Sequence, residues 1–184
     1  MKNSFIALLK PLTLVLACLA SSCLGPRHDI AAITGFDAQR YLGRWYEIAR
    51  LPHSFEKDLI AVTADYHRNT DGTIAVINRG YLPAAQKWSE AIGRARLPEG
   101  PKVGRLEVSF FGPFYADYRV IALDADYQWA LVTTNRSDYL WVLSRSPEMD
   151  RTLVAQLVAQ ARAFGFDTTA LIMVDQSMNL PAAR

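Results

Sequence analysis

Cysteine and histidine are nearly absent from this chain. Its two cysteines, Cys18 and Cys23, both lie near the start, so the rest of the chain has no disulfide and no thiolate for metal binding or catalysis. The three histidines, His28, His53 and His67, are far apart in the sequence, so we predict no metal site. We expect the fold to be stabilised by packing alone.

Motifs of catalysis and of cofactor binding are lacking as well. The sequence has no Gly-x-Ser-x-Gly nucleophile elbow, no glycine-rich loop that would hold a phosphate and no pair of carboxylates at catalytic spacing. We therefore predict that the protein is not an enzyme and that it has no cofactor.

Net charge is close to zero once the start of the chain is set aside. Without Lys2 and Lys10, which lie in the leader described next, 18 basic residues stand against 18 acidic ones. A neutral surface gives no electrostatic attraction to nucleic acid, so we expect no nucleic-acid partner.

Acidic residues are missing from the first 22 positions, which have the pattern of a secretory signal peptide. A charged start at Lys2 precedes an apolar run, Leu12 to Ala20, which is too short to cross a bilayer. The small residues that follow, Ala20-Ser21-Ser22-Cys23, resemble the lipobox of bacterial lipoproteins, in which cleavage leaves Cys23 as a lipid-modified first residue. Two or three acyl chains there would anchor the protein permanently to a membrane.

Two alternatives to this cleavage stay open. Val15-Leu16-Ala17-Cys18 is a rival lipobox with a shorter apolar core, and an ordinary cleaved signal would release a soluble periplasmic protein. We favour Cys23, and Leu24 after it resembles the sorting signal for the outer membrane. The predicted organisation is a lipoprotein signal peptide at 1–22, a tether at 23–33, one folded domain at 34–176 and a C-terminal tail at 177–184.

Strand patterns recur through the folded domain at a spacing of about ten to fifteen residues, which is typical of an up-and-down antiparallel sheet. Turn residues at Asn69 to Gly72 and at Asp124 to Asp126 predict two hairpins. Eight strands is a number that closes a barrel around one small ligand. The predicted strands are Arg44 to Leu51, Ile60 to Arg68, Thr73 to Leu82, Lys87 to Leu97, Arg105 to Phe111, Tyr118 to Asp124, Gln128 to Thr134 and Tyr139 to Arg145.

Helical patterns flank the strands. Phe36 to Leu42 predicts a short helical turn over one barrel end, and Ser146-Pro147-Glu148 predicts the start of a longer helix that stops at Gly165. A short last strand follows at Ala170 to Val174. The predicted fold class is all-β: an eight-stranded up-and-down antiparallel β-barrel, or calyx, with a C-terminal α-helix packed outside and a short final strand.

Because side chains alternate across a strand, one inward residue fixes the direction of the others. Placing Trp45 inside also places Glu47 and Ala49 inside and sends Arg50 outward. The same rule turns Arg145 inward at the end of the eighth strand. There it could stack on Trp45 and donate to carbonyls of the helical turn, which would close the barrel floor.

Many residues predicted to face inward are small. In a barrel of this size, small inward side chains predict a cavity, whereas a shift of one residue in a strand would exchange small for large. The predicted ligand-binding residues are Glu47, Ala49, Ala64, Tyr66, Val76, Asn78, Ala91, Gly93, Val108, Phe110, Tyr118, Val120, Val132, Tyr139 and Trp141.

Glu47 has two interpretations. In an apolar calyx, burial would raise its pKa, and the side chain could hydrogen-bond a lipid head group, Tyr66 or Asn78. The alternative is a structural acid satisfied by neighbouring hydroxyls. At the rim, Phe114, Tyr115 and the loop from Pro52 to Phe55 could meet a bilayer or a dimer partner, or could form a packed lid.

Three short motifs in order resemble the sequence signatures of the lipocalins. The three motifs are Gly43-x-Trp45, Ser137-Asp138-Tyr139 and Arg145, and each lies at a predicted end of the barrel. The second is a variant, because the family more often has Thr-Asp-Tyr there. The structural signature residues are therefore Gly43, Trp45, Asp138 and Arg145. The run Val108 to Tyr115, with Trp45 to Arg50, resembles more narrowly the bacterial outer-membrane lipoprotein lipocalins, which are apolipoprotein D-like.

This resemblance implies a calyx, open at one end, that carries a fatty acid or a lysophospholipid and serves outer-membrane maintenance or stress response. The implied partners are a small amphiphilic lipid and the outer membrane, reached through N-terminal acyl chains on its periplasmic face, with a homodimer as a further option. Two alternatives stay open. One is an enzyme acting on a lipid or isoprenoid with Glu47 as acid or base, and the other is a binder of haem or carotenoid.

Overall fold

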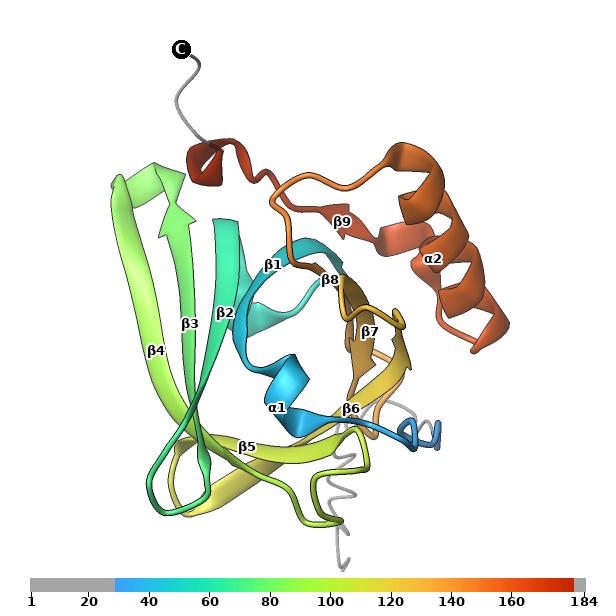
Figure 1. Cartoon of the computed structure of the whole chain (residues 1–184). Helices are drawn as coiled ribbons and strands as arrows, with labels where there is room; N and C mark the ends of the chain where they lie inside the picture. The colour runs from blue at the N-terminus through green and yellow to red at the C-terminus, as the bar shows by residue number, and fades with distance from the viewer. Residues whose placement is uncertain (1–28, 181–184) are drawn as a thin grey trace, which may run out of the picture.

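The computed structural model describes residues 29–180 of the chain. The predicted signal peptide, Cys18, Cys23 and residues 181–184 lie outside the described residues. Nine strands form one sheet in the order β2-β3-β4-β5-β6-β7-β8-β1-β9. Strand β1 also pairs with β2, which closes β1 to β8 into a barrel and leaves β9 outside it (Figure 1).

The predicted fold class is confirmed, including the helix outside the barrel and the short last strand. All strand pairs are antiparallel. The elements are α1 (Ala38–Tyr41), β1 (Gly43–Arg50), β2 (Ile60–Arg68), β3 (Ile74–Leu82), β4 (Lys87–Arg96), β5 (Arg105–Phe111), β6 (Phe114–Leu123), β7 (Trp129–Thr133), β8 (Leu140–Ser144), α2 (Arg151–Ala163) and β9 (Ile172–Met173), with short 3-10 turns η1 (Ser54–Glu56), η2 (Pro83–Ala85), η3 (Thr168–Ala170) and η4 (Ser177–Asn179).

Two element starts differ from the prediction by more than two residues. Strand β6 begins at Phe114 rather than Tyr118, because Phe114 pairs with Phe111 directly across the turn. Helix α2 is capped by Asp150, whose carboxylate accepts from the backbone N–H groups of Thr152 and Leu153, and not by Ser146. An acceptor on the residue immediately before the first turn satisfies its free N–H groups, so the helix starts there.

The closed end of the barrel is built on Trp45, which is fully buried. The guanidinium carbon of Arg145 lies 3.8 Å from the centre of the indole ring, and Arg145 donates to the carbonyls of Arg40, Leu42 and Arg44. Asp37 caps α1, the helical turn that covers this end. The predicted stacking of Arg145 on Trp45 is therefore confirmed.

Gly43 takes part in the same closure. Its φ of +92° lies in the left-handed region, and a Cβ there would be 3.4 Å from a guanidinium nitrogen of Arg145. Glycine is the residue that adopts this backbone without strain.

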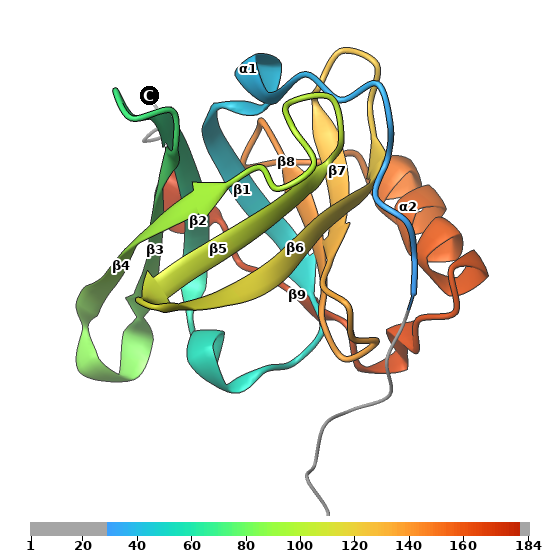
Figure 2. The same cartoon turned by 90° about the horizontal axis from the view of Figure 1, so that it is seen from below.

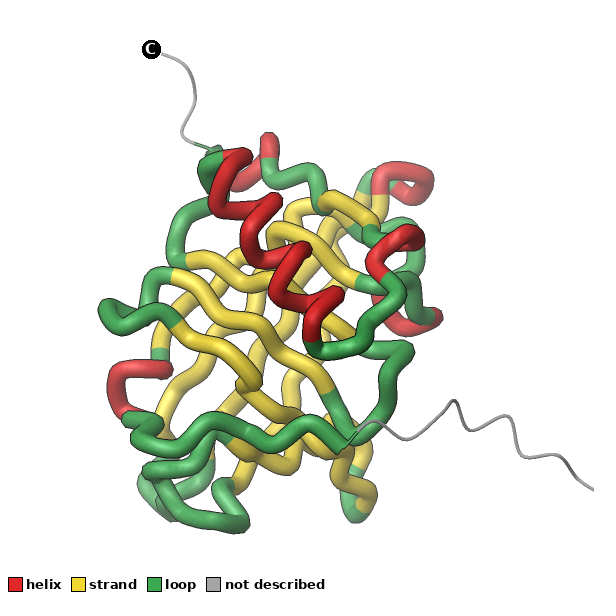
Figure 3. The backbone as a smooth tube through the Cα atoms, turned by 90° about the vertical axis from the view of Figure 1, so that its right-hand side faces the viewer, coloured by secondary structure: helices red, strands yellow, loops and turns green. Residues whose placement is uncertain are grey.

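Helix α2 lies across the outer surface of the barrel (Figure 3). Leu157 and Ala161 face the sheet and are buried among outward-facing side chains of β1, β6, β7 and β8. A second cluster fills the inside of the barrel around Trp45. Because residues 29–180 contain both clusters and the whole barrel, we expect this part of the chain to fold alone.

A β-bulge in β1 overturns two predicted directions. Glu47 pairs with Leu143 and Ala49 with Val142, so Ile48 is the extra residue and the alternation of side chains shifts after it. Ala49 consequently lies outside the barrel, under α2, and not in the cavity. Arg50 is 2% exposed and lies within the protein, although it was predicted to face outward.

The open end lies opposite α1. It is formed by the β1–β2 loop with η1, the β3–β4 hairpin with η2, the β5–β6 turn and the β7–β8 loop (Figure 2). We call this end the mouth. Within residues 29–180, no helix is long and apolar enough to cross a membrane.

Candidate ligand-binding site

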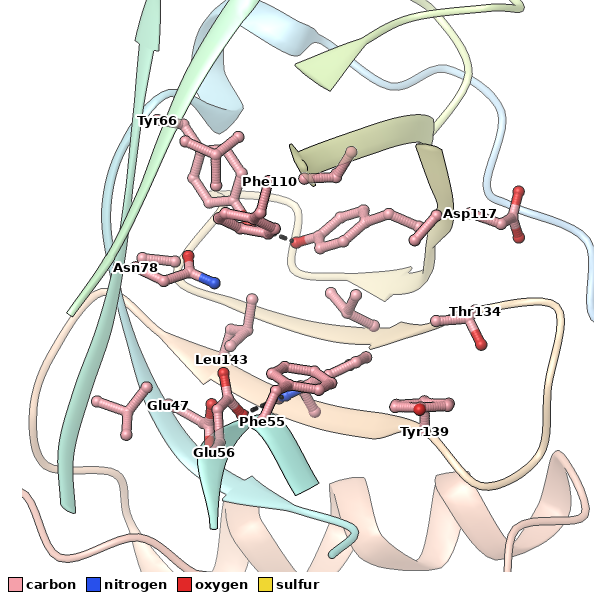
Figure 4. A pocket seen from close by; sticks show the side chains of 18 of the residues that line it. Glu47, Phe55, Glu56, Tyr66, Asn78, Phe110, Asp117, Thr134, Tyr139 and Leu143 are labelled. Atoms are coloured by element: carbon pink, nitrogen blue, oxygen red, sulfur yellow. Dashed lines mark hydrogen bonds between the residues drawn. The ribbon is translucent and has the colours of Figure 1, made fainter. Parts of the chain in front are cut away.

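A cavity of about 410 Å³ opens at the mouth and extends into the barrel. This volume falls in the range of small-molecule sites, roughly 300 to 1,000 Å³. Strands supply most of its wall, and the loops at the mouth supply the rest (Figure 4). The lining residues are Glu47, Phe55, Glu56, Val62, Thr63, Ala64, Tyr66, Val76, Asn78, Val108, Phe110, Tyr115, Ala116, Asp117, Tyr118, Val132, Thr134, Asn135, Arg136, Tyr139, Trp141 and Leu143.

The structure brings most of the predicted ligand-binding residues to this wall. Those that line the cavity are Glu47, Ala64, Tyr66, Val76, Asn78, Val108, Phe110, Tyr118, Val132, Tyr139 and Trp141. Whether they contact a ligand stays a prediction.

Ala49, Ala91, Gly93 and Val120 do not line the cavity. Ala49 lies outside the barrel because of the bulge. Ala91 is exposed on the half of β4 nearer the mouth, where β4 does not pair with β5; the pairing of these two strands begins at Arg94. Gly93 is covered, since a Cβ placed on it would be 2.7 Å from the Phe110 ring. Val120 is buried in the closed-end cluster with Trp45.

Several lining residues could not be found by alternation along strands. Phe55 and Glu56 come from η1, and Asn135 and Arg136 come from the β7–β8 loop. The loop from Pro52 to Phe55 was predicted only to lie at the rim, and no sequence signal marked Glu56. A loop has no fixed period, so its inward side chains follow from tertiary contacts.

Three tyrosines meet at the inner end of the cavity, where Tyr66 and Tyr118 line it and Tyr41 contacts Tyr118 without lining it. The hydroxyls of Tyr41 and Tyr118 are 2.6 Å apart, and Tyr66 donates to Tyr118 at 3.1 Å. Burial raises the pKa of Tyr66 to about 12 and raises the pKa values of Tyr41 and Tyr118 well above the ordinary value. All three hydroxyls therefore stay neutral at physiological pH.

A group of buried charges lies on the opposite side, where β1 meets the mouth. Arg50 donates to Glu47 at 2.7 Å, and its other nitrogen donates to the backbone carbonyls of Glu56 and Leu59. Nε2 of His53 lies 3.0 Å from Oε2 of Glu56, and Trp141 Nε1 donates to the same oxygen at 3.1 Å. The contact between His53 and Glu56 is close but is not aligned as a hydrogen bond. Neither ring nitrogen of His53 has a hydrogen-bond partner.

The two acids of this group have opposite pKa shifts. Burial, and then the charge of Glu56, raises the pKa of Glu47 well above its ordinary value, although Arg50 opposes this. Burial alone would raise the pKa of Glu56, but His53, Trp141 and Glu47 beside it bring that pKa below its ordinary value. Glu47 therefore takes up a proton more readily than Glu56, whose lowered pKa keeps it ionised at neutral pH. The structural interpretation of Glu47 predicted neighbouring hydroxyls as its partners, whereas the partner in the structure is Arg50. Contact of Glu47 with a ligand stays a prediction.

Aromatic rings surround the carboxylate of Glu56. His53 and Phe55 stack with their ring centres 3.9 Å apart, and Tyr139 and Trp141 stack at 5.8 Å. The rim also carries Phe111 and Phe114, which are 83% and 80% exposed. A homodimer or a bilayer contact at this rim stays a prediction.

The remaining signature residue, Asp138, is ion-paired with Arg136 in the β7–β8 loop. Within residues 29–180 no three His, Cys, Asp or Glu side chains are grouped as a metal site would require. Oδ1 of Asn78 is buried in the wall without a hydrogen-bond partner.

Comparisons with known proteins agree with this architecture. A family model described as a lipocalin-like domain matches residues 36–176. The outer membrane lipoprotein Blc of Vibrio cholerae is 44% identical over 86% of this chain and 93% of its own length. Mouse apolipoprotein D is 31% identical over 77% of this chain and 78% of its own length.

Among solved structures, insecticyanin from the tobacco hornworm superposes with a TM-score of 0.67 at 21% identity, covering 84% of this chain and 88% of that one. At this identity the likeness concerns the fold. The predicted outer-membrane localisation is confirmed by the Blc relatives, while lipidation of Cys23 is untested and stays a prediction. The matched domain, the three signatures and the closed barrel lead to one conclusion: the chain belongs to the lipocalin family.

Proposed function

We propose that this protein binds a single-chain amphiphilic lipid, such as a lysophospholipid or a fatty acid, and carries or stores it for maintenance of the outer membrane. The observation that supports this is the cavity of about 410 Å³, whose inner wall is built from Val76, Val108, Val132 and Leu143. An apolar tail fits this wall, and its polar head then lies among the polar residues of the mouth.

Burial of the tail provides the main driving force. Each buried CH₂ group contributes about 0.8 kcal/mol, and the loss of translational freedom and the ordering of side chains oppose this. The burial of a tail of about twelve or more carbons therefore provides enough free energy for a Kd in the micromolar range or below.

The anchor keeps the mouth near its source of lipid. If Cys23 carries the acyl chains, Asp29 follows it by six residues, which span at most about 20 Å when extended. The barrel then stays close to the periplasmic face of the outer membrane, where lipids released from the bilayer are captured.

Native mass spectrometry of the chain from Leu24 onward, incubated with a mixed lipid extract, tests this function. We expect a one-to-one adduct with a single-chain lipid. Val76→Trp places an indole in the cavity and should abolish the adduct. Ile77→Trp is the matched control, because its neighbour Val76 lines the cavity whereas Ile77 does not, and it should keep the adduct.

Two results would contradict the proposal. A wild-type barrel that stays empty in the presence of lysophospholipids and fatty acids would remove the lipid carrier function. An adduct that persists unchanged in Val76→Trp would show that the lipid binds elsewhere on the surface.

A further inference from the structure

The charged side chains that line the cavity are mostly acids. Glu47, Glu56 and Asp117 line it, and Arg136 is the one lining cation among the residues that the structure describes. Arg136 is occupied by Asp138 in the same loop. A ligand head group at the mouth therefore meets carboxylates rather than a free cation.

Two of these acids are neutralised by arginines. Glu47 is paired with Arg50, and Asp117 accepts from both Arg105 and Arg119. None of these three arginines lines the cavity. Their charges stabilise the wall without being presented to a ligand.

Glu56 is different, because within residues 29–180 no arginine or lysine side chain pairs with its carboxylate. Its partners are the indole N–H of Trp141, the ring of His53 and the carboxyl group of Glu47, and the contact with Arg50 is made by its backbone carbonyl. The residue is 6% exposed, so solvent does little to screen its charge.

Aromatic faces complete the surroundings of this carboxylate. Phe55, Tyr139 and Trp141 line the cavity together with Glu56, and Trp141 donates to its carboxylate. Phe55, Tyr139 and Glu56 are labelled in Figure 4. The ring centres of Tyr139 and Trp141 lie 6.1 and 6.3 Å from the ring centre of Phe55. Ring faces attract cations, most strongly where water is excluded, and repel anions.

His53 adds a second unsatisfied group. Its side chain is 3% exposed, and both ring nitrogens lack a hydrogen-bond partner. A buried polar group without a partner costs free energy, and a donor on a head group seated against Glu56 can supply one hydrogen bond to the imidazole of His53.

We propose that Glu56, with the aromatic faces beside it, makes this cavity select amphiphiles whose head carries an ammonium group over tail-matched carboxylates. The inference rests on the proposed function, because it names the head group of the lipid held there. An ammonium head supplies donors and a positive charge to Glu56, whereas a fatty-acid carboxylate placed at the same depth is repelled by it.

Tail-matched probes test this selection directly. The chain from Leu24 onward is titrated at pH 7 with hexadecylamine, palmitic acid and monopalmitoylglycerol, each below its aggregation concentration, and binding is followed by tryptophan fluorescence. We expect hexadecylamine to bind at least about tenfold more tightly than palmitic acid, with the uncharged probe between them.

Glu56→Gln removes the charge and keeps the shape of the side chain. We expect it to weaken hexadecylamine binding and to strengthen palmitic acid binding, so that the preference falls to less than about threefold. Glu107→Gln is the matched control, because Glu107 pairs with Arg96 and does not line the cavity. It should keep the wild-type preference, which shows that net charge is not the cause.

Each result decides between the two proposals. Equal binding of all three probes by the wild type, or a preference that Glu56→Gln leaves unchanged, would overturn the head-group inference and leave lipid binding intact. No binding of any probe would overturn both. If Glu56→Gln does not fold, Tyr139→Leu gives a second measurement, in which loss of one ring face should lower the affinity for the amine more than the affinity for monopalmitoylglycerol.

Discussion

Arg50 and Glu47 form a buried ion pair that exists because Ile48 bulges out of β1. Without the bulge, Ala49 would face the cavity and Arg50 would face solvent. With it, both charged side chains lie inside the protein, at 2% and 4% exposure, and Arg50 ties β1 to the backbone of the β1–β2 loop. One extra residue thus fixes both the wall and the mouth of the cavity.

Replacing Arg50 with Met should destabilise the protein by about 3 kcal/mol, because it leaves the carbonyls of Glu56 and Leu59 without a donor and Glu47 without its counter-ion. Urea unfolding measures this loss. The double variant Glu47→Leu with Arg50→Met should cost no more than Arg50→Met alone, since it removes the uncompensated acid as well. Strictly additive losses from the two single variants would show that the pair is not coupled.

The pH dependence of stability should differ in sign for the two buried acids. The pKa of Glu47 is raised in the folded protein, so the folded state holds that proton more tightly, and stability is lost as pH rises from about 4.5 through the raised pKa. The pKa of Glu56 is lowered, so its contribution is present above about 4.5 and is lost as pH falls below that value.

Thermal unfolding from pH 3 to pH 9 tests these signs. Relative to Glu47→Gln, the wild type should lose stability as pH rises, and relative to Glu56→Gln it should lose stability as pH falls. Differences that are flat with pH for both variants would contradict the assigned shifts. Thr63 lines the same cavity as Glu47 and carries no charge, so Thr63→Val serves as a pH-independent control.

The sequence allowed the barrel, its closed end and most of its lining to be predicted, because these follow from alternation and from three short motifs. It failed where tertiary contacts override local period. The bulge at Ile48 is invisible in a run of alternating residues, and Phe110 packs over Gly93 because two strands approach each other closely. Glu56 stands in a loop, where no periodicity indicates which side chains turn inward.

The closed end should depend on the planar shape of Arg145 rather than on its charge. Arg145→Lys keeps the charge but loses the fork that donates to the carbonyls of Arg40, Leu42 and Arg44, and it stacks less well on Trp45. We expect a loss of about 2 kcal/mol in urea unfolding. Arg44→Lys is the control, because the Arg44 side chain is 52% exposed and pairs with Asp65, and it should cost less than about 1 kcal/mol. Equal effects would contradict the special role of Arg145.

Any side chain at Gly93 should destabilise the protein, because β4 and β5 lie too close together there to hold it. A Cβ there would lie 2.7 Å from the Phe110 ring and 2.7 Å from the carbonyl oxygen of Ser109. The ring can move but the backbone carbonyl moves only with its strand, so Gly93→Ala should cost about 1 to 3 kcal/mol. Adding Phe110→Ala should recover part of this loss and not all of it.

Gly112→Ala is the control, since nothing lies within 4 Å of the added atom, and it should change the free energy of unfolding by less than about 0.5 kcal/mol. A Gly93→Ala variant as stable as Gly112→Ala would show that β4 and β5 are free to separate at this point, and that Phe110 does not hold a fixed place in the cavity wall.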